Sequence, residues 1–200
     1  MSREKNQLQR ILTFSDLMNK FQKINRVILE KDRERYENDV EHSYMLAMLA
    51  DYIIVIENLK LDRRAVMMYS MMHDLVEIYA GDTYIGSRDT EYIASKHSRE
   101  ADALVRIISE FPEYPDLQIY IEKYEKKVDE ESKFVYALDK LQPVIQIYLD
   151  SGRTWRKEGM SFADLCFHKD EKVKVSPVVE KYWNELRGIL EKSQTELFPS

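Results

Sequence analysis

The sequence predicts an all-α protein with a single helical-bundle domain, and three observations support this prediction. The 200 residues include only five Gly and five Pro, too few for the many tight turns of an all-β fold. Charged residues make up 33% of the chain and hydrophobic residues 44%, as in amphipathic helices around a sizeable core. Apolar residues also recur at helical spacing through most of the sequence. Because no repeat, low-complexity tract or linker interrupts it, we expect residues 1–200 to form one domain.

Apolar periodicity and a capping signal place the first two helices. Residues 8–29 carry apolar side chains at helical spacing, and a polar connection follows over residues 30–39. Asn38 followed by Glu41 resembles a capping box, in which each side chain accepts a hydrogen bond from the other residue's backbone N–H. We therefore expect the second helix to run from about Asn38 to about Glu57.

The third helix is predicted over residues 63–79 and is apolar almost all round. A helix of this kind is usually central and buried. Gly81 is expected to end it, because glycine is common just past a helix C-terminus. A loop should follow over residues 82–90.

The second half of the chain is expected to hold further helices. They span residues 91–111, 116–127, 130–150 and 177–192. Pro143 should kink the third of these, and the C-terminal helix should pack on the bundle. The stretch over residues 151–172 is polar, contains two glycines and is expected to be irregular.

Charge and apolar runs bear on location and partners. The net charge of -6 argues against non-specific nucleic-acid binding, which relies on a basic surface. The longest apolar stretch, near residues 52–56, is far too short to span a bilayer, and the N-terminus lacks an apolar signal core. Cys166 is the only cysteine, so neither an intrachain disulfide nor a paired-cysteine zinc site can form. We therefore expect a cytoplasmic protein without a membrane segment.

The pair His73-Asp74 lies among apolar residues of the third predicted helix. Buried charge is unfavourable unless it is paired or binds a metal, and such a pair taken alone is more often a core ion pair. His42 and Asp139 also stand among apolar residues, and Glu77 follows His73 by four residues, on the same helix face. Two His and two Asp form a mixed nitrogen and oxygen site that suits manganese, iron, cobalt, magnesium or zinc. Water in the open positions of such a site would serve hydrolysis.

The order of His42, then His73-Asp74, then Asp139 resembles the H…HD…D signature of the HD-domain phosphohydrolases. The residues around these positions are similar to the bacterial 5′-deoxynucleotidase branch of that superfamily. The similar segments are Glu41-His42-Ser43, His73-Asp74-Leu75-Val76-Glu77, Ala80-Gly81-Asp82 and Ala137-Leu138-Asp139-Lys140-Leu141. Ile24-Asn25-Arg26 resembles the segment in which that family places a phosphate-binding arginine. The resemblance spans about residues 17–148.

The resemblance implies a helical bundle of the HD-domain type around one divalent cation. The implied metal ligands are His42, His73, Asp74 and Asp139. It also implies a homodimer, and hydrolysis of nucleoside 5′-monophosphates, preferably deoxy forms, to nucleoside and phosphate. Glu77 would act on the attacking water, Asp82 would lie at the reaction centre, and Arg26 would hold the substrate phosphate.

General chemistry agrees with the implied reaction. A metal lowers the pKa of its bound water and neutralises phosphate charge, and a carboxylate such as Glu77 can take the water's proton. A guanidinium such as Arg26 can hold phosphate oxygens through two parallel hydrogen bonds. No Walker loop or Rossmann glycine fingerprint occurs, which disfavours a nucleoside kinase or dehydrogenase. Val27 stands where the family has an aromatic residue against the sugar, so we expect weaker discrimination against ribonucleotides.

Plainer interpretations exist for several of these residues. Arg26 taken alone is more often a solvated surface residue, and Asp82 could simply cap the turn that precedes it. His97 is expected to be exposed, and His168 to lie in a polar loop. Lys140 could contact the substrate or pair with the aspartate before it.

Two other functions stay open beside hydrolysis of monophosphates. The runner-up is an enzyme for another phosphorylated nucleotide, such as a deoxynucleoside triphosphate or a guanosine alarmone, with the same four ligands. Such substrates need more cations, and the basic residues of segment 30–37 are interleaved with acids, which argues against this alternative. The third function is a non-catalytic metal-binding module. Glu77 and Asp82 argue against it, because a structural site does not need extra carboxylates.

Overall fold

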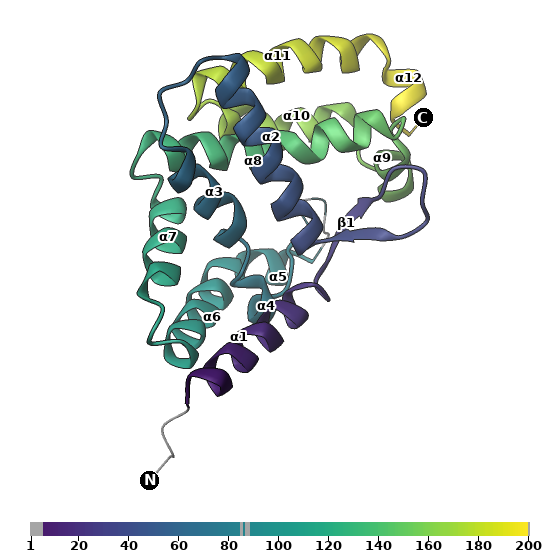
Figure 1. Cartoon of the computed structure of the whole chain (residues 1–200). Helices are drawn as coiled ribbons and strands as arrows, with labels where there is room; N and C mark the ends of the chain where they lie inside the picture. The colour runs from purple at the N-terminus through teal and green to yellow at the C-terminus, as the bar shows by residue number, and fades with distance from the viewer. Residues whose placement is uncertain (1–5, 85, 87–88, 200) are drawn as a thin grey trace.

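A computed structural model of the chain describes residues 6–84, 86 and 89–199, and helices dominate it (Figure 1). The helices are α1 (Gln7–Phe21), α2 (Asp39–Ile56), α3 (Arg63–Met72), α4 (Glu77–Ala80), α5 (Thr90–Ala94), α6 (Lys96–Glu110), α7 (Pro115–Lys126), α8 (Glu130–Leu149), α9 (Arg153–Glu158), α10 (Phe162–Val173), α11 (Pro177–Lys192) and α12 (Gln194–Leu197). Strands β1 (Asn25–Leu29) and β2 (Tyr36–Asn38) pair as an antiparallel hairpin. The predicted all-α class is confirmed. Within the described ranges, no helix combines the length and the apolar character needed to cross a bilayer.

Helix α8 is the centre of the fold. It packs against α2, α3, α7, α10 and α11, and Figure 1 shows α10 and α11 on one side of it and α3 and α7 on the other. Its buried residues include Val135, Leu138 and Leu141, which belong to the larger hydrophobic cluster. A second hydrophobic cluster joins α1, α6 and α7 beneath α4. Helix α11 packs against α8 and α10 and closes the larger cluster.

The prediction of one helix over residues 8–29 is wrong in its second half. Helix α1 ends at Phe21, and the residues from Asn25 to Leu29 form strand β1. The short apolar run in this segment fits a strand as well as a helix, and local periodicity cannot separate the two. Pairing with β2 stabilises the strand in this segment. The Leu29 backbone N–H also donates to the Thr154 hydroxyl at 3.0 Å, a contact with a distant part of the chain.

The predicted start of the second helix is confirmed. The Asn38 side chain accepts from the Glu41 backbone N–H, and the Glu41 carboxylate accepts from the Asn38 backbone N–H. Helix α2 then runs from Asp39 to Ile56. This cap aligns the first turn of α2, which holds His42.

The third helix ends earlier than predicted, at Met72 instead of residue 79. Beyond it, tighter i→i−3 hydrogen bonds continue the chain, such as the Glu77 N–H to the Asp74 carbonyl at 2.9 Å. Short α4 follows, and Gly81 ends it as expected, with a positive φ of 76°. The expectation of burial all round is also wrong, because Met71 is 51% exposed.

Two further expectations along the second half are corrected. The helix predicted over residues 91–111 is divided into α5 and α6 at Ser95, whose hydroxyl donates to the Tyr92 carbonyl and so competes with the helical pattern. The stretch 151–172, expected to be irregular, forms α9 and α10. Its glycines flank α9 instead of interrupting it. Within the loop predicted over residues 82–90, residues 85, 87 and 88 lie outside the described part of the chain.

Candidate metal centre

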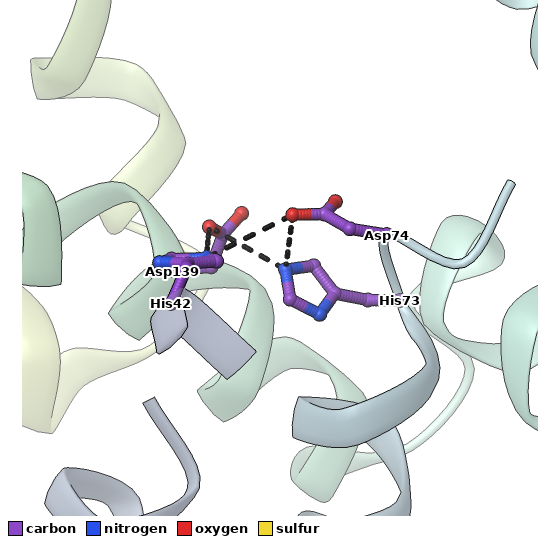
Figure 2. A group of neighbouring side chains, drawn as sticks. All are labelled: His42, His73, Asp74 and Asp139. Atoms are coloured by element: carbon purple, nitrogen blue, oxygen red, sulfur yellow. Dashed lines mark hydrogen bonds and ion pairs between the residues drawn. The ribbon is translucent and has the colours of Figure 1, made fainter. Parts of the chain in front are cut away.

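The four residues predicted as metal ligands come together at one point of the bundle. His42 projects from α2, His73 caps the end of α3, Asp74 follows it in the tight turn, and Asp139 projects from α8. Figure 2 shows the four side chains pointing toward one another, and one ligand atom from each lies within 4.8 Å of all the others. His42 Nε2 lies 3.1 Å from Asp139 Oδ1, and His73 Nε2 lies 3.0 Å from Asp74 Oδ2.

Hydrogen bonds behind the two imidazoles fix which nitrogen faces the cluster. His73 Nδ1 lies 3.1 Å from the Ser70 carbonyl oxygen, which can only accept, so Nδ1 carries the hydrogen. Gln142 donates its amide N–H to Gln146, which leaves the Gln142 oxygen to accept from His42 Nδ1 at 3.1 Å. In the neutral form of both rings, the Nε2 lone pair is therefore directed into the cluster, as a metal ligand requires.

The charges of the four side chains favour a cation at this point. Burial raises the pKa of Asp74, but His73 and Arg26 outweigh it and hold the pKa of Asp74 well below its usual range. Burial and the nearby Arg26 lower the pKa of His42 to about 4, so this ring is neutral. Burial lowers the pKa of His73, but the adjacent Asp74 and Asp139 carboxylates outweigh it and raise this pKa to about 10. The two carboxylates thus attract positive charge to His73 Nε2.

The residues present fit a divalent metal ion. His73 Nε2 is buried and has no hydrogen-bond partner among the described residues, although it faces two carboxylates. Two neutral imidazoles and two ionised carboxylates are ligands that several first-row divalent ions and magnesium accept. Binding of such an ion would displace a proton from His73, because a ligating imidazole must be neutral.

Arg26 lies at the centre and is not a solvated surface residue, so the plainer interpretation is wrong. Its side chain is 13% exposed, and Nη1 lies 2.7 Å from Asp74 Oδ2 and 3.5 Å from Asp39 Oδ1. Its Nε lies 3.4 Å from Glu37 Oε1. Arg26 is therefore the counter-ion of three carboxylates, and its position on strand β1 brings it there.

Two of these carboxylates were missed by the sequence analysis. Glu37 and Asp39 are almost fully buried at the start of α2. Burial and the nearby Asp74 carboxylate together raise the pKa of Asp39 to about 8. Burial raises the pKa of Glu37 to about 7, although the positive charge of Arg26 acts in the opposite direction. Both flank the capping Asn38 in segment 30–39, which the sequence predicts to be a polar connection. Nothing in the local pattern separates them from ordinary capping acids.

Glu77 and Asp82, the two predicted catalytic carboxylates, lie beside the cluster. Glu77 is buried on α4, and its carboxylate groups with those of Asp39 and Asp74 within 4.8 Å. Burial raises the pKa of Glu77 well above its usual value, and the Asp74 and Asp82 carboxylates add to this effect. Burial also raises the pKa of Asp82, which Arg26 opposes. Glu77 is the first residue of the short helix α4, which follows the tight turn. It is therefore not on one continuous helix with His73, although the sequence predicts one.

A pocket with mostly apolar walls opens next to the cluster. Arg26 and Asp82 line it on the side of the metal centre, with Val27 beside them on β1. The apolar walls include Tyr84, Val144, Ile147, Trp155, Met160 and Leu165. Lys169 of α10 lines it as well. The arrangement offers an apolar compartment next to a polar, metal-binding one.

The other residues considered in the sequence have clear locations. Lys140 pairs with Asp139, its Nζ lying 2.5 Å from Oδ2. His97 is exposed, as expected. His168 lies on α10 instead of in a loop, and in the described part of the chain it joins no cluster able to hold a metal.

Comparison with known proteins gives consistent results. A sequence model described as "HD domain" matches residues 18–183. The 5′-deoxynucleotidase HDDC2 of Danio rerio is 28% identical over 144 residues, which cover 70% of each chain, and that of Homo sapiens is 28% identical over 139 residues, 68% of this chain and 66% of the relative. A crystal structure from Magnetospirillum magnetotacticum MS-1, named a predicted metal-dependent phosphohydrolase, superposes with a TM-score of 0.81 at 27% identity and covers 96% of both chains. A conserved hypothetical protein from Pyrococcus furiosus shares the fold, with a TM-score of 0.63 at 20% identity over 90% of this chain and 99% of that one.

Proposed function

Because this chain belongs to the HD domain family, we propose that it hydrolyses (deoxy)nucleoside 5′-monophosphates to nucleoside and phosphate. It is a metal-dependent phosphohydrolase of nucleotides. The observation that carries the finer proposal is the cluster of two His and two Asp, bordered by further carboxylates and Arg26. The names of the HDDC2 relatives support the monophosphate substrate.

The proposed ligands are His42, His73, Asp74 and Asp139. When bound, a divalent cation lowers the pKa of water and neutralises the charge of the phosphate. The ligand set accepts manganese, cobalt, magnesium, iron or zinc, so we propose no single native metal.

The remaining polar residues of the centre have proposed roles of their own. Glu77 accepts a proton from the attacking water, because its buried carboxylate groups with that of ligand Asp74. Arg26 binds the substrate phosphate at the mouth of the pocket and keeps its ion pair with Asp74. Asp82 lines the same pocket and is placed to protonate the leaving 5′-oxygen of the nucleoside.

A substrate panel tests this function. The protein, reconstituted in turn with each of the five metals, is incubated with nucleoside mono-, di- and triphosphates, and the released phosphate is measured. We expect release from deoxynucleoside monophosphates and none after chelation. Because Val27 stands beside Arg26 in place of an aromatic residue, we expect weaker discrimination against ribonucleotides. No release from any monophosphate with any metal would contradict the proposed function.

A second candidate is hydrolysis of a nucleotide with more phosphates, and one observation favours it. Along the sequence, the basic residues of segment 30–37 are interleaved with acids. In space, Lys96, Lys140 and Lys172 lie close enough to Asp74 or Asp139 for their pKa values to be affected. Faster release of phosphate from dGTP than from dGMP in the same panel would favour this candidate.

We also propose that two copies of the chain associate through α2. Tyr44, Met48, Tyr52 and Val55 follow one another at helical spacing, and each is more than half exposed. An apolar stripe of this kind on one helix can pair with its own copy about a two-fold axis.

Three further properties belong to the proposal. We propose that residues 1–200 form a single domain, that the protein is cytoplasmic, and that it has no nucleic-acid partner.

Replacing Met48 with glutamate tests the dimer. The new charges would face each other across the two-fold axis, so we expect the mass in solution to fall from two chains to one. Light scattering after size-exclusion chromatography measures this mass. Met71→Glu on α3 is the matched control, because Met71 and Met48 are each 51% exposed. A wild-type protein that is already monomeric would contradict the proposal.

A further inference from the structure

Among the residues that the structure describes, Lys169 is a buried cation without a counter-ion. It lies on α10, is 6% exposed and lines the pocket beside the metal centre. Burial of an ammonium group is unfavourable unless a hydrogen-bond partner or an opposite charge compensates it. Neither a hydrogen bond nor an ion pair of the Lys169 side chain occurs within the described ranges.

The charged groups that act most strongly on Lys169 are three cations and one carboxylate. Burial, together with Lys140, Lys172 and Arg26, lowers the pKa of Lys169 to about 7, while Asp139 opposes them. Lys140 and Arg26 are each matched by carboxylates at 2.5 Å and 2.7 Å. Asp139 is already engaged by Lys140, and so the charge of Lys169 has no anion of its own.

The path of α8 relates Lys169 to the metal centre. Asp139, Pro143 and Ile147 are spaced by one helical turn and so lie on the same face of α8. Pro143 and Ile147 line the pocket, which therefore continues directly from the proposed ligand Asp139. Arg26, which borders the metal centre, and Lys169 both line this pocket. The nucleoside attached to a phosphate at the metal centre would extend toward the apolar walls formed by α8, α9 and α10.

We propose that Lys169 binds the phosphate group of the nucleotide, at the junction between the metal centre and the apolar pocket that receives the nucleoside. The inference rests on the proposed function, since it needs a phosphorylated substrate at the metal centre. It adds a substrate-binding residue from α10 to those that the sequence predicts. A bound phosphate dianion would supply the negative charge that Lys169 lacks among the described residues.

Substitutions at Lys169 separate phosphate binding from packing. Lys169→Met removes the charge and keeps a long side chain, so the buried position stays filled. Lys169→Arg keeps the charge. Lys174→Met is the control, because Lys174 is an exposed lysine at the C-terminal cap of the same helix. All variants are loaded with metal, and their metal content and thermal unfolding are measured first.

Two probes then report on the two ends of the substrate. Inorganic phosphate and a deoxynucleoside are each tested as inhibitors of monophosphate hydrolysis and as ligands in calorimetry. We expect Lys169→Met to weaken phosphate binding and raise KM by about 10- to 100-fold, the usual scale for a charge-assisted hydrogen bond. Deoxynucleoside binding and metal content should not change, and Lys169→Arg should recover part of the phosphate affinity.

The possible results test the role of Lys169 separately from the proposed hydrolase function on which it rests. Unchanged phosphate affinity in a folded Lys169→Met protein would overturn the role of Lys169 while leaving the hydrolase proposal intact. Weaker binding of the deoxynucleoside alone would overturn it too, because the lysine would then contact the nucleoside. If Lys169→Met does not fold, Lys169→Arg decides, since a purely structural lysine would leave its phosphate affinity at the wild-type value. A wild-type protein that hydrolyses no monophosphate contradicts the proposed function itself.

Discussion

Replacing Asp74 with alanine is expected to remove the bound metal and the phosphohydrolase activity together, with a loss of about 1,000-fold or more. Asp74 Oδ2 lies 3.0 Å from His73 Nε2 and 3.8 Å from His42 Nε2, so the substitution removes one of the four proposed metal ligands. Metal analysis of the purified protein and phosphate release measure the two effects.

Asp74 also pairs with Arg26, so a second ligand variant is needed to interpret the loss. Asp139→Ala removes a ligand that Arg26 does not contact in this structure, and we expect the same joint loss of metal and activity. Asp51→Ala is the control, because Asp51 lies on α2 and pairs with the exposed Arg63. Full activity of Asp139→Ala, or of a chelated protein, would overturn the assignment of the metal centre.

Glu77→Gln is expected to keep the metal and the fold, yet to lower kcat by about 100-fold or more, the usual scale for a general base. Glutamine fills the same buried space, and it removes one of several carboxylates that repel each other around Asp74. Thermal stability should therefore not fall. The measurements are metal content, thermal unfolding and steady-state kinetics, with Glu185→Gln on the exposed face of α11 as the control.

The comparison with Asp74→Ala decides the role of Glu77. If Glu77→Gln loses metal as completely as Asp74→Ala, then Glu77 is a ligand and not the base. If it keeps both metal and activity, its carboxylate is structural, and Asp82 becomes the candidate because it lines the same pocket. Asp82→Asn would then be expected to show the loss in kcat.

The sequence predicted the helices that local signals define. The capping box of Asn38 and Glu41 placed the start of α2, and the range 177–192 predicted for the C-terminal helix matches α11. The ligand candidates were recognised because a charged pair in an apolar helix is unusual, and because the H…HD…D order is specific. All of these signals lie within a few residues of each position or in a known pattern.

What the sequence did not reveal depends on contacts between distant segments. Arg26 and Asp39 are 13 residues apart and meet only because β1 pairs with β2 ahead of α2. Lys169 lies in a stretch read as irregular, and its burial follows from the packing of α10 against α8. Neighbouring residues give no sign of such convergence, since charged side chains are exposed in most helices of this composition.

The tight turn after Met72 has a consequence for engineering the protein. Successive residues of an α-helix are about 100° apart and those of a tighter i→i−3 turn about 120° apart, so this turn rotates the residues that follow it relative to α3. Asp74 lies in the turn and Glu77 directly after it, so the turn sets where their carboxylates lie relative to His73. Replacements that favour an uninterrupted α-helix from Arg63 to Ala80 would move these carboxylates away from their present positions. Selection for thermostability in this segment would therefore trade against catalysis.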